Sequence, residues 1–168
     1  LALTAVGASD DVQQAARRDQ PDTHSLFDAG RAGEEDAMTR KVDWNQYRNF
    51  VEEEFRCKHT GRCEMSPDFM DRLQELRIAY ARPMIITSGY RHVSHPVEMK
   101  KGRPGAHTFG RAADILVSHA DAVDLIKLAI DYGFTGFGIQ QKAGSTRFIH
   151  LDDMEPDVTR PRPAIWSY

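Results

Sequence analysis

Two histidines and one aspartate stand at positions that suit a catalytic metal ion. His107 and Asp114 lie seven residues apart in the segment 105–114, and His150 follows in the segment 148–152. Two imidazole nitrogens and one carboxylate oxygen fill three corners of a zinc tetrahedron and leave the fourth corner for water. The three residues therefore predict a catalytic zinc site.

Each of the three residues has a simpler interpretation when it is taken alone. His107 would then be a loop histidine, Asp114 a capping residue and His150 a core histidine with satisfied hydrogen bonds. A single metal site explains all three together, because a buried and unpaired Asp114 would be costly without a cation nearby. The glycine spacing and the apolar residues around Asp114 favour the same site.

The segment that carries the first two residues predicts a turn followed by a strand. A turn at residues 108–110, which Gly110 would permit, leads from a loop into a strand at residues 112–116. Both His107 and Asp114 can then face one cavity.

A hairpin is expected to supply the third residue. Residues 134–140 and 145–151 have the composition of strands, and residues 141–144 have that of the turn between them. Successive side chains of a strand alternate between its faces, so His150 and Asp152 would point the same way. The hairpin would thus aim both side chains into one site.

A helix and a buried strand precede the metal segment. Ser66 as N-cap and Pro67 at the first helical position predict a helix start, and Pro83 would stop this helix after roughly four turns. The apolar run 84–87 then predicts a buried strand. These elements deliver the chain to residues 88–91.

A second helix and an aromatic cluster are expected to contribute to the core. The pattern of residues 118–121 resembles a capping box, and the helix that it starts would end at Gly133. Trp44, Tyr47 and Phe50 recur at helical spacing, which favours an apolar anchor over a binding motif.

The length and composition indicate one domain with an N-terminal extension. The chain has 168 residues, and a domain of this size can bury a core without metal or disulfide support. Residues 1–41 contain few large apolar residues, so we expect a flexible or extended arm that could order on a partner. The folded domain would span residues 42–168.

Charge and hydropathy exclude two classes of partner. The net charge is −3, with both signs interspersed along the chain, so no basic face for nucleic acid is expected. No apolar run reaches the length of a membrane span. The mildly apolar residues 1–9 could be the end of a signal segment or a processed terminus, so secretion stays open.

Cys57 and Cys63 lie close together in the sequence and allow three interpretations. They could form a small disulfide loop, join His59 in a second metal site, or remain free thiols at a turn. Two cysteines and one histidine leave a structural zinc site one ligand short. A local loop, disulfide-linked if the protein is exported, is the preferred interpretation.

Three blocks of the sequence resemble the signature of the M15 zinc peptidases. These blocks are Ser-Gly-Tyr-Arg at 88–91, His-Thr-Phe-Gly-Arg-Ala-Ala-Asp at 107–114 and Phe-Ile-His-Leu-Asp at 148–152. That family contains D-alanyl-D-alanine carboxypeptidases, phage endolysins and cell-wall endopeptidases. The resemblance covers roughly residues 42–168 and implies an α+β fold, with a small central antiparallel sheet flanked by helices, like that of the hedgehog domain.

The resemblance also implies roles for individual residues. His107, Asp114 and His150 match the zinc ligands of the family. Arg91 matches the arginine that contacts substrate or the oxyanion, a role that suits a guanidinium group.

The general base is where this chain departs from part of the family. Several members place an acidic residue three before the last histidine, whereas this chain has Arg147 there. The subgroup with His-x-Asp is the better match, which makes Asp152 the candidate base and Asp153 the fallback. A carboxylate that only orients a ligand histidine is the alternative role for Asp152.

A second departure lies just before the first ligand. Many relatives carry serine and often glutamine where this chain has Gly105 and Ala106. Because those polar side chains are expected to contact the peptide, the resemblance defines the metal site but not the bond that is cut.

The resemblance implies a zinc-dependent peptidase that acts on D-amino-acid-containing peptides of peptidoglycan. Such an enzyme would be extracytoplasmic or virion-associated, and the arm 1–41 could assemble with a phage or other particle. The alternative is a non-catalytic module that keeps the fold and the zinc for binding or for a structural role.

Overall fold

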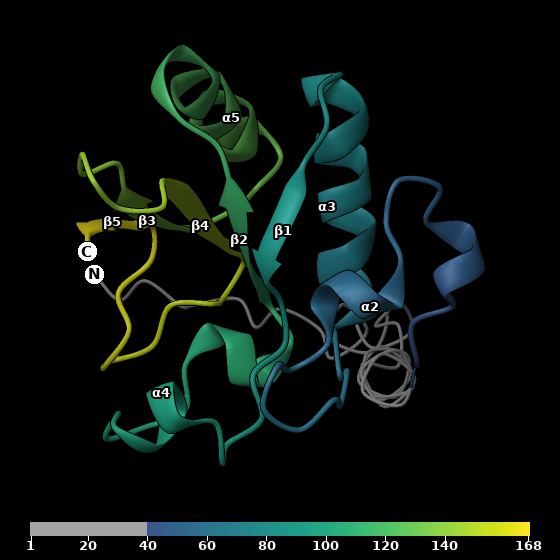
Figure 1. The fold of residues 1–168 in the computed structure, drawn as a ribbon, viewed down its shortest axis with the longest axis vertical. Coiled ribbons are helices and arrows are strands. Elements are labelled where there is room, and N and C mark those ends of the chain that lie inside the picture. The colour runs from purple at the N-terminus through teal and green to yellow at the C-terminus, as the bar shows by residue number, and fades with distance from the viewer. Residues whose placement is uncertain (1–39) are drawn as a thin grey trace, which may run out of the picture. The chain divides into compact units, whose positions relative to one another are not determined.

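The computed structural model of the chain describes residues 40–168, which form one mixed sheet with flanking helices (Figure 1). The predicted arm, residues 1–41, lies almost wholly outside the described residues. In chain order the elements are η3 (Trp44–Gln46), α2 (Glu52–Phe55), α3 (Pro67–Tyr80), β1 (Ile85–Ser88), α4 (Pro96–Met99), η4 (Ala106–Phe109), β2 (Ala112–Leu116), α5 (His119–Asp131), β3 (Gly136–Gln140), β4 (Phe148–Asp152) and β5 (Ala164–Ser167), where η denotes a 3-10 helix.

The sheet has the strand order β1-β2-β4-β3-β5 and confirms the predicted α+β class. The predicted hairpin is present as β3 and β4, which pair antiparallel. One pairing differs from the expected all-antiparallel sheet, because β5 runs parallel to β3. β4 ends opposite the first residue of β3, and residues 153–163 cross this end of the sheet to the other side of β3, so β5 starts at the same end as β3.

Alternation along the strands separates an apolar face of the sheet from a polar face. Ala113 and Ile115 of β2 lie opposite Leu151 and Ile149 of β4, and all four side chains are buried in the main core. That core also contains the apolar side chains of α3 and α5. The other face carries the residues of even number on these two strands. In Figure 1, α5 lies above the sheet, whereas α4 and the yellow loop that leads from β4 to β5 lie below it.

The predicted helix after Ser66 is confirmed as α3. The Ser66 hydroxyl accepts a hydrogen bond from the Phe69 amide, and Pro67 occupies the first helical position. The helix ends at Tyr80, and Ala81 adopts a left-handed conformation. With 14 residues α3 is a typical globular helix, and no helix within residues 40–168 is long and apolar enough to cross a membrane.

Two local predictions were wrong in detail. Ser118 stands at the N-cap of α5 but makes no capping hydrogen bond with its side chain. The strand predicted at residues 84–87 is present as β1, but it is an edge strand and not a buried one, since Ile85 is exposed and the rest of the strand is only partly buried. The predicted core role of the aromatic residues near Trp44 is confirmed, because Tyr47 and Phe50 are buried.

Cys57 and Cys63 are free thiols in this structure. Within residues 40–168 they and His59 do not belong to any group of three potential metal ligands. Burial raises the pKa of the Cys63 thiol to about 11, so this group stays protonated at neutral pH.

Gly110 allows the chain to turn from η4 into β2. Its φ is 66°, and a Cβ atom at this position would lie 2.1 Å from the Glu64 carbonyl oxygen. We therefore expect Gly110→Ala to lower the free energy of unfolding by about 3 kcal/mol or more, as measured by urea denaturation. Gly61 is the matched control, because its φ is 73° and nothing lies within 4 Å of the added Cβ.

Gly61→Ala should cost only about 1 kcal/mol, the strain of a left-handed residue. Equal losses in the two variants would contradict a steric role for Gly110.

Candidate metal centre

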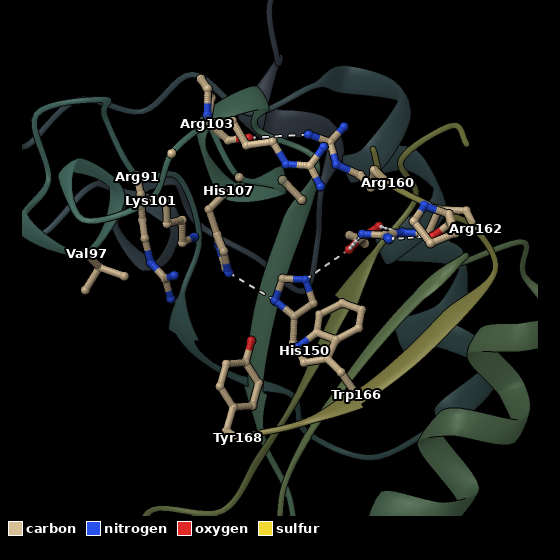
Figure 2. A pocket seen from close by; sticks show the side chains of 16 residues that line it. Arg91, Val97, Lys101, Arg103, His107, His150, Arg160, Arg162, Trp166 and Tyr168 are labelled. Atoms are coloured by element: carbon tan, nitrogen blue, oxygen red, sulfur yellow. Dashed lines mark hydrogen bonds and ion pairs between the residues drawn. The ribbon is translucent and has the colours of Figure 1, made fainter. Parts of the chain in front are cut away.

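The strand register and the short helix η4 bring His107, Asp114 and His150 together. Asp114 on β2 lies directly opposite His150 on β4, and η4 places His107 beside them. Asp114 Oδ1 is 3.2 Å from His107 Nε2 and 2.8 Å from His150 Nδ1, and the two nitrogens are 3.1 Å apart. Figure 2 shows the two imidazoles pointing toward each other across this gap.

These three distances fit the ligand set of a small divalent cation. Ligand atoms around a tetrahedral ion with bonds of about 2.0 Å lie about 3.3 Å apart. All three side chains are buried, and within residues 40–168 they form the only group of three potential ligands. A buried His-Asp-His group of this kind could hold a metal ion.

The outer nitrogen of each imidazole has a partner that leaves the inner nitrogen available. His107 Nδ1 donates to the Gly89 carbonyl oxygen at 2.6 Å, so its Nε2 turns toward Asp114. His150 Nε2 lies 3.2 Å from Asp152 Oδ2, so its Nδ1 turns inward. Partners on the outer nitrogen fix the tautomer and the ring orientation of a metal-binding histidine.

Burial and the surrounding charges shift the pKa values within the group. Burial lowers the pKa of His107. Burial also opposes protonation of His150, but hydrogen bonds with Asp114 and Asp152 outweigh it and raise the pKa of that imidazole. Burial acts to raise the pKa of Asp114, but the two histidines hold it well below its usual range. Asp114 is therefore an anion, as a metal ligand must be.

Arg91 lies against the metal group, which is the set of three candidate ligands His107, Asp114 and His150. Its guanidinium donates to Asp114 Oδ2 at 2.6 Å and to Ser88 Oγ at 2.9 Å. The Arg91 amide also donates to the His107 carbonyl oxygen at 3.1 Å. Arg91 therefore holds the one Asp114 oxygen that does not face the histidines, and its side chain still reaches the cleft.

Asp152 lies on the far side of the His150 ring from the other two ligands. Its oxygens accept hydrogen bonds from Arg162 Nε at 2.9 Å and Arg162 Nη2 at 2.8 Å, and the Met154 amide donates to Oδ1. Together with the contact to His150, these bonds occupy both carboxylate oxygens. This placement favours the orienting role of Asp152 over the role of general base.

The other two positions considered for the base lie outside the cleft. Asp153 is buried in ion pairs with Arg72 and Arg111, at 3.1 Å and 2.8 Å. Arg147 contacts His119 at 2.8 Å. The residue type at position 147 therefore does not shape the cleft of this chain.

A cleft of about 610 Å³ opens onto the two histidines. Its charged lining is mostly cationic, with Arg91, Lys101, Arg103, Arg160 and Arg162. Among the described residues, the only carboxylate in this lining is Asp152. Each of these cations also pairs with a carboxylate of the chain, so the lining offers hydrogen-bond donors to a ligand carboxylate without a large net positive charge.

Sequence reasoning missed several residues that shape the cleft. Trp166 packs on His150 with ring centroids 5.2 Å apart, and Figure 2 shows the Tyr168 hydroxyl directed toward the two imidazoles. The buried Glu98 accepts hydrogen bonds from the Gly105 amide and the Thr108 hydroxyl, which ties down the loop before His107. The arginine and aromatic residues that follow residue 159 were the sequence signal that could have pointed to the C-terminal part of this lining.

Asp152 links the stability of the fold to pH. Burial acts to raise its pKa, but hydrogen bonds with His150 and Arg162 outweigh burial and lower the pKa from 3.8 to about 2. The unfolded chain then binds a proton more readily than the folded one. The stabilisation, about 2 kcal/mol, is therefore complete above about pH 4 and is lost as the pH falls toward 2.

Urea unfolding of the metal-free protein across this pH range should show that loss in the wild type. The Asp152→Asn variant should not show the loss of about 2 kcal/mol that protonation of Asp152 causes in the wild type. An identical pH dependence in both proteins would contradict the assignment.

Comparison with protein families identifies the kind of protein that this chain resembles. A family model described as Peptidase M15 matches residues 47–152. The matched range contains Arg91 and the three candidate ligands, whereas Arg162 and Trp166 follow it. No curated protein matches the chain significantly.

Proposed function

The chain belongs to the M15 peptidase family, and we propose that it is a zinc-dependent enzyme that hydrolyses D-amino-acid-containing peptide bonds of peptidoglycan. The observation that carries the proposal is the buried group His107, Asp114 and His150, whose inner atoms lie 2.8–3.2 Å apart. Peptidase membership and a ligand set of this kind together favour metal-assisted hydrolysis.

The side chains around the group have distinct tasks in this proposal. His107, Asp114 and His150 would hold zinc, which when bound supplies a Lewis acid and lowers the pKa of a water molecule. Arg91 is held by Ser88 and Asp114, so its guanidinium is preorganised to bind a substrate carboxylate or the oxyanion. Asp152 keeps His150 oriented.

The cationic hydrogen-bond donors of the cleft suit a peptide substrate that carries carboxylates. Four cationic side chains besides Arg91 line the cleft, namely Lys101, Arg103, Arg160 and Arg162. Peptidoglycan stem peptides carry free carboxylates, which suit such a lining. A protein that acts on this substrate would be extracytoplasmic or virion-associated. We also propose that residues 1–41 assemble with a phage or other particle.

Asp152 already accepts hydrogen bonds on both carboxylate oxygens, and this favours a second candidate function. Among the described residues no free carboxylate lines the cleft, and a hydrolase needs an acceptor for the proton of its water. A zinc-containing module that binds peptidoglycan without cutting it would not need that acceptor.

One experiment separates these two functions. The full chain would be purified with its metal, its zinc content measured, and the protein incubated with peptidoglycan of several wall types. Zinc near one per chain with release of muropeptides supports the peptidase. Zinc with binding to the wall but no release supports the module, and a chain without zinc under all loading conditions overturns both.

A further inference from the structure

We propose that Arg162, in the segment after the family match, is a positioning residue of the metal centre that acts on His150 through Asp152. The inference rests on the proposed function only in taking His150 as a metal ligand. It assigns to the C-terminal segment a direct part in building the site.

The contact between Arg162 and Asp152 is a buried fork. Nε and Nη2 of Arg162 each donate to a different oxygen of Asp152, at 2.9 Å and 2.8 Å. The exposed fractions of the two side chains are only 9% and 1%. Two parallel charge-assisted hydrogen bonds fix the plane of a carboxylate as well as its position. Asp152 therefore cannot rotate while Arg162 holds it.

The fixed carboxylate in turn determines which nitrogen of His150 faces the metal group. An ionised carboxylate only accepts hydrogen bonds, so His150 Nε2 must carry a proton to bind Asp152 at 3.2 Å. His150 Nδ1 lies 2.8 Å from the Asp114 carboxylate, so in the metal-free protein this nitrogen also shares a proton with Oδ1. Because Asp152 holds the proton on Nε2, Nδ1 is the nitrogen that would give up its proton and offer its lone pair to a cation.

Strand β5 brings an aromatic side chain against the linked residues Arg162, Asp152 and His150. Gly138 of β3 lies opposite His150 on one side and beside Trp166 of β5 on the other. The Arg162 guanidinium lies over the Trp166 ring, 5.4 Å from the ring centre, and the same ring packs on His150. The Trp166 ring thus contacts both Arg162 and His150, the two residues that Asp152 connects.

Two glycines of β3 leave the space that the Asp152 carboxylate and the Trp166 ring occupy. A Cβ atom at Gly136 would lie 2.2 Å from Asp152 Oδ2, and one at Gly138 would lie 2.8 Å from Trp166 Nε1. Side chains at these positions would displace the carboxylate or the ring. The residue types of β3 therefore suit a buried carboxylate with its arginine partner.

The test compares Arg162→Met with Arg160→Met in the full chain. Arg160 lines the same cleft, but it pairs with Asp157 and the Pro104 carbonyl oxygen instead of Asp152. Zinc affinity is measured by competition with a chelator, and the His150 Nε2 proton is followed by 1H–15N NMR in the metal-free protein. We expect Arg162→Met to weaken zinc binding about 10–100-fold and to expose this proton to rapid exchange. Arg160→Met should leave both unchanged.

Arg162→Lys keeps the charge without the fork and should recover only part of the affinity, because an ammonium group cannot hold both oxygens in one plane. This variant also keeps the test decisive if Arg162→Met fails to fold. Full zinc affinity together with a protected Nε2 proton in either Arg162 variant would overturn the inference.

The two proposals fail in different ways. A wild-type chain that binds zinc but releases no muropeptides would refute the peptidase and leave the role of Arg162 intact. A chain that binds no zinc would overturn both proposals, whereas full zinc affinity and a protected Nε2 proton in the Arg162 variants would overturn the positioning role alone. A proton that is unprotected in the wild type would overturn the positioning role.

Discussion

In the proposed zinc peptidase, His150→Ala is expected to remove the bound zinc and the hydrolytic activity together. The imidazole supplies one of three inner ligand atoms, and its neighbours Asp114 and His107 cannot close a tetrahedral site without it. A metal that polarises a carbonyl contributes several kcal/mol to the transition state, so the activity should fall by about three orders of magnitude or more. Zinc content and muropeptide release from peptidoglycan measure the two losses.

His59→Ala serves as the control for this change. His59 is exposed, and its ring packs on His95 with centroids 6.1 Å apart. The control should keep both zinc and activity. If His150→Ala retained stoichiometric zinc, the ligand assignment would be wrong. If it lost zinc but kept its activity, the metal would have no part in the reaction.

Arg91→Ala is expected to lower kcat/KM by about 10²–10³-fold when zinc is kept in excess. The effect follows from the loss of a preorganised cation next to the metal group, which would otherwise hold a substrate carboxylate or the oxyanion. The same change frees Asp114 Oδ2 from its contact at 2.6 Å and should weaken zinc binding. Steady-state kinetics at several zinc concentrations separate the two effects.

Arg103→Ala is the matched variant for Arg91, because Arg103 lies in the same cleft with its side chain about half exposed. It should change kcat/KM far less. Arg91→Lys should restore zinc binding better than catalysis, since lysine keeps the charge but lacks the planar fork. Full activity of Arg91→Ala in excess zinc would exclude a direct role for this residue.

The local elements could be predicted because their signals lie within a few residues. The N-cap Ser66 and the apolar periodicity that follows it define α3, and the run before Ser88 defines β1. The parallel pairing of β5 was missed, since it depends on the path of residues 153–163 across the sheet and not on any local pattern. The short helices near Trp44 were also missed, because spacing alone does not distinguish a helix from a compact apolar loop.

The candidate ligands could be named from their chemistry and from strand alternation. The expected placement of Asp114 and His150 on neighbouring antiparallel strands agrees with their pairing in the sheet. The role of Asp152 could not be derived in this way. Its partner Arg162 is ten residues away along the chain, and only the path of residues 153–163 from β4 to β5 brings the two together.

The sequence by itself determined which residue types could form a metal group and which strands would carry them. Spacing and alternation are properties of a chain that any strand or turn must obey. Tertiary structure decided how the group is supported, because a buried carboxylate takes its function from the groups that surround it. In this protein Arg162 and His150 surround Asp152, so the carboxylate predicted as a base occupies the place of a support for the ligand.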